Sequence, residues 1–152
     1  MVAFGLPLGI AIGRIGDVIY GEHYGTATDF ILGVRNTHPD ADVPSPDVAY
    51  HSGGLYEMLI GAVVFAIVWS LRRRLAAPTA MTWTVIALLA AGRFAEFFVR
   101  SDSEKLALGL ETAQWTSLAL LAIAAVGAWL TIGRSGAGTG ADARASADGR
   151  TT

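Results

Sequence analysis

The sequence TAQWTSLALLAIAAVGAWLTI, residues 112–132, contains no charged side chain. About 20 mostly apolar residues are needed for a helix to cross the hydrocarbon core of a bilayer. The stretch meets this requirement and therefore predicts a transmembrane helix. Composition agrees, since 53% of the 152 residues are hydrophobic and the mean hydropathy is +0.47. These values favour a membrane protein over a soluble domain of the same length.

Three further apolar segments precede this stretch: Met1–Tyr20, Leu55–Leu71 and Met81–Val99. We therefore predict an all-α membrane protein with about four transmembrane helices in residues 1–132 and an irregular outer loop at about 21–54. In the first segment, glycines recur every four residues at Gly5, Gly9 and Gly13. Such spacing lets helices pack closely in membranes, so we expect a packed span there. Residues 133–152 have no apolar period and predict a disordered cytoplasmic tail.

The positive charges indicate the orientation of the chain. Residues 72–74 are all arginine and directly follow the second apolar segment, so the positive-inside rule places them in the cytoplasm. The loop at 21–54 is then outside, where it carries five carboxylates against Arg35 alone. Its three prolines predict irregular structure, with a short strand over Phe30–Arg35.

Polar side chains in the apolar segments gather at one predicted depth. Ionisable groups inside a membrane are costly, usually face a protein interior or a watery cavity, and usually have a function. In the predicted orientation each of them lies at the outer end of its segment. Arg14 and Asp17 end the first segment, and His51, Tyr56 and Glu57 begin the second. Arg93, Glu96 and Arg100 end the third, and Glu111 and Gln114 begin the fourth. This common depth predicts one polar site at the outer face.

Helical spacing refines the third segment. Arg93, Glu96 and Arg100 follow an i, i+3, i+7 pattern, which places them on one helix face, and Glu96 can pair with Arg100. Arg14 and Asp17 are likewise three residues apart. A stripe of ion pairs that only joins helices is the alternative, but intramembrane charges favour the functional interpretation.

Composition excludes several kinds of chemistry. The chain has no cysteine, which rules out disulfides, thiolate catalysis and cysteine metal sites. The three histidines lack the spacing of metal-binding motifs, so neither a metal nor another cofactor is predicted. No nucleic-acid partner is expected. For His51 a place in the loop, and for Tyr56 an anchor in the aromatic belt, stay open as alternatives.

Residues 13–25, GRIGDVIYGEHYG, resemble the signature G-R-x-[GA]-N-F-x-N-x-E-x-x-G of the prolipoprotein diacylglyceryl transferase family. Asp17, Val18 and Tyr20 stand where the signature has Asn, Phe and Asn. Asp17 changes the chemistry, because an ionised carboxylate only accepts hydrogen bonds and partly neutralises Arg14, whereas asparagine also donates.

Three further blocks follow the family pattern in order. Residues 51–57, HSGGLYE, resemble H-P-S-Q-L-Y-E, and residues 93–100, RFAEFFVR, resemble R-F-x-x-E-F-F-R with the glutamate one position early. Gln114 and Ser117 match a G-Q-x-x-S motif at the start of the last span. The resemblance covers about residues 5–132 and only the C-terminal half of the family's length, without its N-terminal spans.

The resemblance implies a transfer reaction. Family members move the diacylglyceryl group of phosphatidylglycerol to the lipobox cysteine of a prolipoprotein, and a thioether forms as glycerol phosphate leaves. By resemblance Arg14 and Arg93 hold the phosphate, for which the planar guanidinium is suited, and His51 accepts a proton. The remaining implied site residues bind substrate and shape the site: Glu22, Tyr56, Glu57, Glu96 and Arg100.

The resemblance also implies a place and partners. We expect a multi-pass protein of the bacterial plasma membrane with its site on the outer face. Its expected partners are phosphatidylglycerol, other membrane lipid, a prolipoprotein lipobox peptide and a protein that supplies the missing spans. One alternative is a non-catalytic membrane module that binds anionic lipid or another membrane protein. A further one is a piece of a longer gene, which an in-frame continuation upstream of Met1 would reveal.

Overall fold

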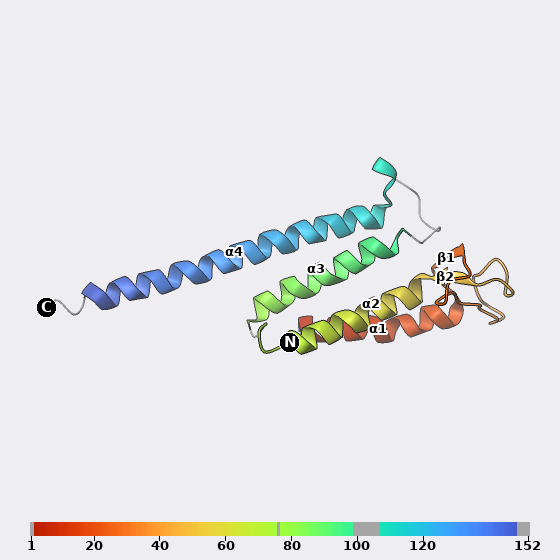
Figure 1. Cartoon of the computed structure of the whole chain (residues 1–152), viewed down its shortest axis with the longest axis horizontal. Helices are drawn as coiled ribbons and strands as arrows, with labels where there is room; N and C mark the ends of the chain where they lie inside the picture. The colour runs from red at the N-terminus through yellow and green to blue at the C-terminus, as the bar shows by residue number, and fades with distance from the viewer. Residues whose placement is uncertain (1, 76, 99–106, 149–152) are drawn as a thin grey trace.

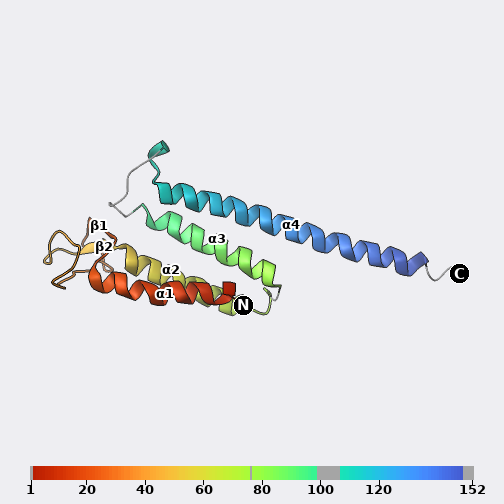
Figure 2. The same ribbon diagram turned by 180° about the vertical axis from the view of Figure 1, so that it is seen from behind.

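The computed structural model describes residues 2–75, 77–98 and 107–148. In chain order the elements are α1 (Val2–Tyr20), β1 (Tyr24–Ala27), β2 (Tyr50–Ser52), α2 (Gly53–Leu71), α3 (Pro78–Glu96), the short 3-10 helix η1 (Ala107–Gly109) and α4 (Thr112–Asp148). The helices lie lengthwise beside one another, with α3 between α2 and α4, and α1 packs on α2 (Figure 1, Figure 2). The predicted all-α fold is confirmed, with one small sheet at an end of the bundle.

Among the described residues, three helical stretches are long and apolar enough to cross a membrane: Ala3–Tyr20, Gly53–Leu71 and Thr112–Thr131. Helix α3 is less apolar because it contains three threonines in its first half and Arg93 and Glu96 near its end. It packs against both α2 and α4. Contact with helices on both sides can keep the polar side chains of α3 away from lipid.

The polar ends of the helices lie together. The C-terminal ends of α1 and α3, the N-terminal ends of α2 and α4, and both strands occupy the same end of the bundle (Figure 1). The structure therefore agrees with the common depth that the sequence predicts for the polar residues.

The connection after α1 turns sharply and is held by Asn36. Gly21 adopts a left-handed conformation with φ of 69°, and a Cβ there would lie 2.8 Å from Asn36 Nδ2. The Asn36 side chain donates hydrogen bonds to the carbonyl oxygens of Val18 at 3.2 Å and Ile19 at 2.8 Å. These carbonyls belong to the last turn of α1, where no helical partner is available. Asn36 thus ties the loop that follows α1 to the end of this helix.

The loop between α1 and α2 contains a two-stranded antiparallel sheet, in which Tyr24 pairs with Ser52 and Ala27 with Tyr50. The strand predicted over Phe30–Arg35 is wrong. Residues 30–33 form a turn closed by a hydrogen bond of 2.7 Å from Gly33 N–H to the Phe30 carbonyl. Of the residues in the predicted strand, only Val34 forms a bridge, which pairs it with Tyr50. The Ser52 side chain caps α2 by accepting from Leu55 N–H at 3.2 Å.

The glycine stripe of α1 does not make the close helix contact that its spacing predicts. A Cβ added at Gly5, Gly9 or Gly13 would meet nothing within 4 Å. A close approach of α1 to α2 occurs instead at Gly61 of α2, where a Cβ would lie 2.7 Å from the Pro7 carbonyl oxygen. Sequence spacing identifies small residues, but it does not reveal which of them faces a neighbouring helix.

This difference gives a matched pair of variants. Gly61→Ala should lower the free energy of unfolding by about 1–3 kcal/mol, because the new methyl group meets backbone that has little room to move. Gly9→Ala adds the same methyl group in open space and should be neutral or slightly stabilising, since alanine favours helix. Unfolding by SDS in mixed micelles would measure both, and equal effects would contradict the packing.

Helix α4 continues past Ile132 to Asp148. It therefore includes most of the segment that composition predicts as a disordered tail. Alanines alternate with polar residues in its last turns, and alanine is the strongest helix former. The domain division at residue 132 stays a prediction.

Candidate functional site

One buried carboxylate joins two arginines from separate helices. Glu57 of α2 is 6% exposed. Its Oε2 lies 2.5 Å from Arg14 Nε of α1, and its Oε1 lies 2.9 Å from Arg93 Nη1 of α3. Arg14 Nη1 also contacts Asp17 Oδ2, one turn along the same helix. Residues that are 79 positions apart in sequence therefore meet at one point.

Glycine at position 54 makes this meeting sterically feasible. A Cβ on Gly54 would lie 2.8 Å from Asp17 Cβ and 3.2 Å from Val18 N. The first turn of α2 thus lies directly against the end of α1. Glu57 follows Gly54 by three residues and falls on the same helix face, which directs its carboxylate toward Arg14.

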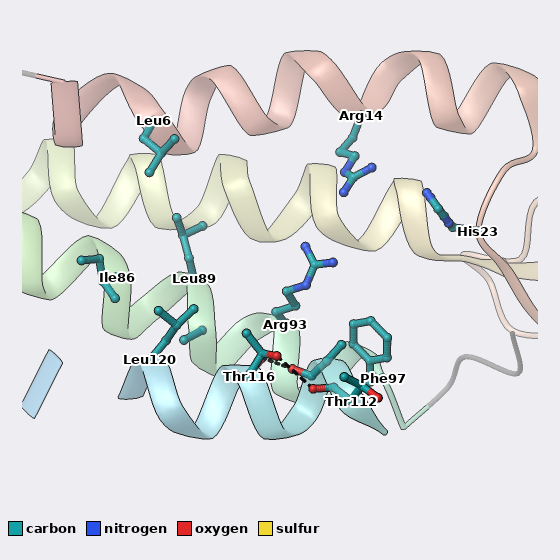
Figure 3. Close-up of a pocket in the computed structure, with 13 residues that line it drawn as sticks. Leu6, Arg14, His23, Ile86, Leu89, Arg93, Phe97, Thr112, Thr116 and Leu120 are labelled. Carbon is teal, nitrogen blue, oxygen red and sulfur yellow. Dashed lines mark hydrogen bonds between the residues drawn. The ribbon is translucent and has the colours of Figure 1, made fainter. Parts of the chain in front are cut away.

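The two arginines border a large cavity. It has a volume of about 830 Å³, within the usual range for ligand sites. Figure 3 shows Arg14 and Arg93 pointing toward one another, with His23 on the same side and Leu6, Leu89 and Leu120 further along. The cavity therefore has two guanidinium groups at one end and is apolar over most of its length, with α1, α3 and α4 contributing its walls.

Two carboxylates contact the two arginines. Arg14 and Arg93 face the carboxylates of Asp17 and Glu57. Arg14 is held on two sides and its side chain is 27% exposed, whereas the Arg93 side chain is 45% exposed. The Arg93 guanidinium carbon lies 5.6 Å from the centre of the Phe97 ring, a favourable cation–π distance. Arg93 is thus the more accessible of the two cations.

His51 and Tyr56 form a separate pair. His51 Nδ1 lies 2.5 Å from the Tyr56 hydroxyl oxygen. Both residues line a second cavity of about 560 Å³, together with Phe30, Leu59 and Glu96. Neither His51 nor Tyr56 lines the cavity of the arginines. Of the predicted site residues, Arg14 and Arg93 thus line one cavity, whereas His51, Tyr56 and Glu96 line the other.

The loop after α1 adds a residue that the sequence analysis did not single out. His23 lines the arginine cavity, and its Nε2 lies 4.0 Å from Asp17 Oδ2. Glu22 is exposed, and its N–H donates to the Asp17 carbonyl at 3.1 Å. Ligand atoms of Asp17, Glu22 and His23 lie within 4.8 Å of one another and could hold a cation. His23 occupies a variable position of the motif, so the motif gave no signal for it.

The fourth block docks α4 on α3. Gln114 Oε1 accepts from Glu111 N–H at 3.0 Å, and its Nε2 lies 3.4 Å from the Phe94 carbonyl oxygen. Ser117 is buried one turn later and lines the arginine cavity. Gln114 thus fixes α4 beside the residue that follows Arg93. Arg100 and its predicted pairing with Glu96 lie outside the residues that the structure describes.

The sequence that forms this site matches a known protein family. A family model described as prolipoprotein diacylglyceryl transferase matches residues 1–130. The chain belongs to this family. The resemblance drawn from the four motifs is therefore confirmed.

Several relatives carry the name phosphatidylglycerol–prolipoprotein diacylglyceryl transferase. That of Nitrosomonas europaea is 37% identical over 77% of this chain and 42% of the relative. That of Methylibium petroleiphilum is 30% identical over 88% of this chain and 51% of the relative, and one from Streptomyces coelicolor is 36% identical over 81% and 36%. The chain thus spans about half the length, or less, of the curated relatives that it matches. No solved structure matches it.

Proposed function

We propose that the chain transfers the diacylglyceryl group of phosphatidylglycerol to the lipobox cysteine of a prolipoprotein. The observation that supports this most is the convergence of Arg14 and Arg93 on Glu57 at the border of a cavity that is otherwise mostly apolar. A phospholipid has the matching form, with an anionic phosphate attached to apolar chains. Relatives of this chain are named for the same substrates.

The reaction makes a clear electrostatic demand. The sulfur of the peptide forms a bond to the glycerol carbon of the diacylglyceryl group, and the bond from that carbon to the phosphate oxygen breaks. The leaving glycerol phosphate carries one more negative charge than the diester. Preorganised cations in a site with little water stabilise such developing charge most effectively. Arg93 and Arg14 would supply these cations, with Glu57 holding both in place.

The other predicted residues take supporting roles in this proposal. Glu22, Tyr56, Glu57, Glu96 and Arg100 shape the site and bind substrate. The attacking thiol comes from the peptide, which suits a chain without cysteine. We place the protein in the bacterial plasma membrane with its site on the outer face.

A reconstituted transfer assay tests this function. The purified chain in vesicles of phosphatidylglycerol should raise the mass of a lipobox peptide by one diacylglyceryl group. A peptide with Cys→Ser should stay unmodified. Unmodified cysteine peptide, beside modified peptide produced by the Nitrosomonas europaea relative under the same conditions, would contradict the catalytic proposal.

His51 is proposed as the acceptor of the thiol proton, with Tyr56 orienting its ring. His51→Gln should then lower kcat by about 100-fold, the lower end of the range for general bases, and leave the Kd for phosphatidylglycerol unchanged. Tyr56→Phe keeps the ring and removes only the hydroxyl group, so its effect on kcat should be smaller. An unchanged kcat in His51→Gln would assign this pair to packing around the second cavity.

A second candidate is a non-catalytic module that binds anionic lipid. The separation of His51 from the cavity of the arginines favours it, because lipid binding needs no proton acceptor. Specific binding of phosphatidylglycerol that is lost in Arg93→Ala, without any modified peptide, is the result expected of such a module.

A further inference from the structure

The donors of Arg14 are already engaged by protein carboxylates. A guanidinium presents two pairs of parallel N–H bonds, one from its two Nη atoms and one from Nε with an Nη, and each pair fits a phosphate or carboxylate bidentately. Asp17 contacts Nη1 and Glu57 contacts Nε at 2.5 Å. Each pair therefore includes a nitrogen that already contacts a carboxylate, and a phosphate that binds Arg14 bidentately competes with that carboxylate.

The two carboxylates differ in how readily they can leave. Glu57 is buried and also contacts Arg93, so its release from Arg14 would disturb the junction of three helices. Asp17 lies on the same helix as Arg14, and its side chain is 18% exposed. A rotation about the Asp17 side-chain bonds is enough to break its contact with Arg14, because no other helix has to move. Asp17 is thus the carboxylate that an incoming phosphate would displace.

We propose that Asp17 is a specificity-determining residue, which competes with the lipid phosphate for Arg14 and lowers the affinity of the cavity for anionic headgroups. This inference rests on the proposed function only in taking a phosphate as the ligand of the two arginines. Arg93, whose side chain is more exposed and contacts Glu57 alone among the described carboxylates, then makes the first contact with the phosphate. Arg14 joins when Asp17 releases it.

Asp17 also changes the total charge beside the cavity. Asp17 and Glu57 contact the two arginines, and the Glu22 carboxylate lies close to that of Asp17. An uncharged residue at position 17 removes one negative charge from beside the cavity. Opposite charges a few ångströms apart attract strongly where little water is present. The resident carboxylate therefore weakens selection for anionic over zwitterionic lipid.

The test compares phosphatidylglycerol binding between variants of the full chain. Asp17→Asn removes the charge and keeps the shape, and it should lower the Kd for phosphatidylglycerol in nanodiscs of phosphatidylcholine by about five- to ten-fold. Asp17→Glu retains a carboxylate and should show no such gain. Asp47→Asn makes the same change of charge on an exposed residue of the outer loop and should leave the Kd unchanged.

The outcomes separate this inference from the proposed transfer reaction. Tighter binding in Asp17→Asn alone supports the competition, whether or not the peptide is modified. An unchanged or raised Kd in Asp17→Asn would overturn it, even if the wild-type chain transfers lipid. Equal gains in Asp17→Asn and Asp17→Glu would also overturn it, because they would assign the effect to the packing of Asp17 against Gly54.

Discussion

Arg93→Ala should lower kcat/KM for lipid transfer by about 100- to 1,000-fold, the effect expected when one preorganised donor to developing negative charge is removed. Arg93 is the more exposed cation of the cavity, and it contacts Glu57 at 2.9 Å. Its loss removes the proposed first contact with the phosphate and also leaves one oxygen of Glu57 without its ion pair. Rates of peptide modification over a range of phosphatidylglycerol concentrations would measure the effect.

Arg93→Lys is the matched control. Lysine keeps the positive charge but offers no planar fork, so transfer should be partly retained. Arg73→Ala removes a cation at the opposite end of the bundle, beyond α2, and should have little effect. Full activity in Arg93→Ala would contradict the assignment of this residue to the phosphate.

Glu57→Ala should lower the free energy of unfolding by about 3 kcal/mol, the lower end of the range for breaking a buried ion pair. The lower end applies because the Arg93 side chain is 45% exposed and can be solvated in part. The removed carboxylate joins α1 to α3 through α2, so both arginines lose their shared partner. Unfolding by SDS in mixed micelles measures the change.

Glu57→Gln keeps the shape and removes the charge, and its effect should be intermediate. A double variant with Arg93→Ala should cost less than the sum of the two single changes, since the residues act as one network. Additive effects would show that the three charged groups do not interact in the folded protein.

Much of the fold could be predicted because the hydropathy of a segment indicates which residues cross the membrane and at what depth its polar residues lie. The apolar segments correspond to α1, α2, α3 and α4, with ends that differ by a few residues. The same pattern put Arg14, Glu57 and Arg93 at one depth, and the structure brings these residues into contact. The depth of a residue in the membrane and the helix face on which it lies both follow from its position along one helix. Both can therefore be predicted from the sequence.

Lateral placement could not be predicted, because it depends on which helices are neighbours. His51 lies at the same end of the bundle as Arg14, yet it lines a different cavity. Gly9 and Gly61 both lie on apolar helices, but only Gly61 contacts a neighbouring helix in the described structure. The short strands depend on pairing between Tyr24–Ala27 and Tyr50–Ser52, which are distant in sequence, so local propensity at Phe30–Arg35 was misleading.

One phosphate held by two arginines is best tested with a double-mutant cycle on phosphatidylglycerol binding. The Kd would be measured for the wild-type chain, Arg14→Ala, Arg93→Ala and the double variant in the same nanodiscs. Arg93→Ala should raise the Kd by about 30-fold or more, as expected for a lost charge-assisted contact. The double variant should bind only slightly more weakly than Arg93→Ala, with a coupling of about 1–2 kcal/mol. Independent, additive losses, or no loss in either single variant, would contradict a shared phosphate site.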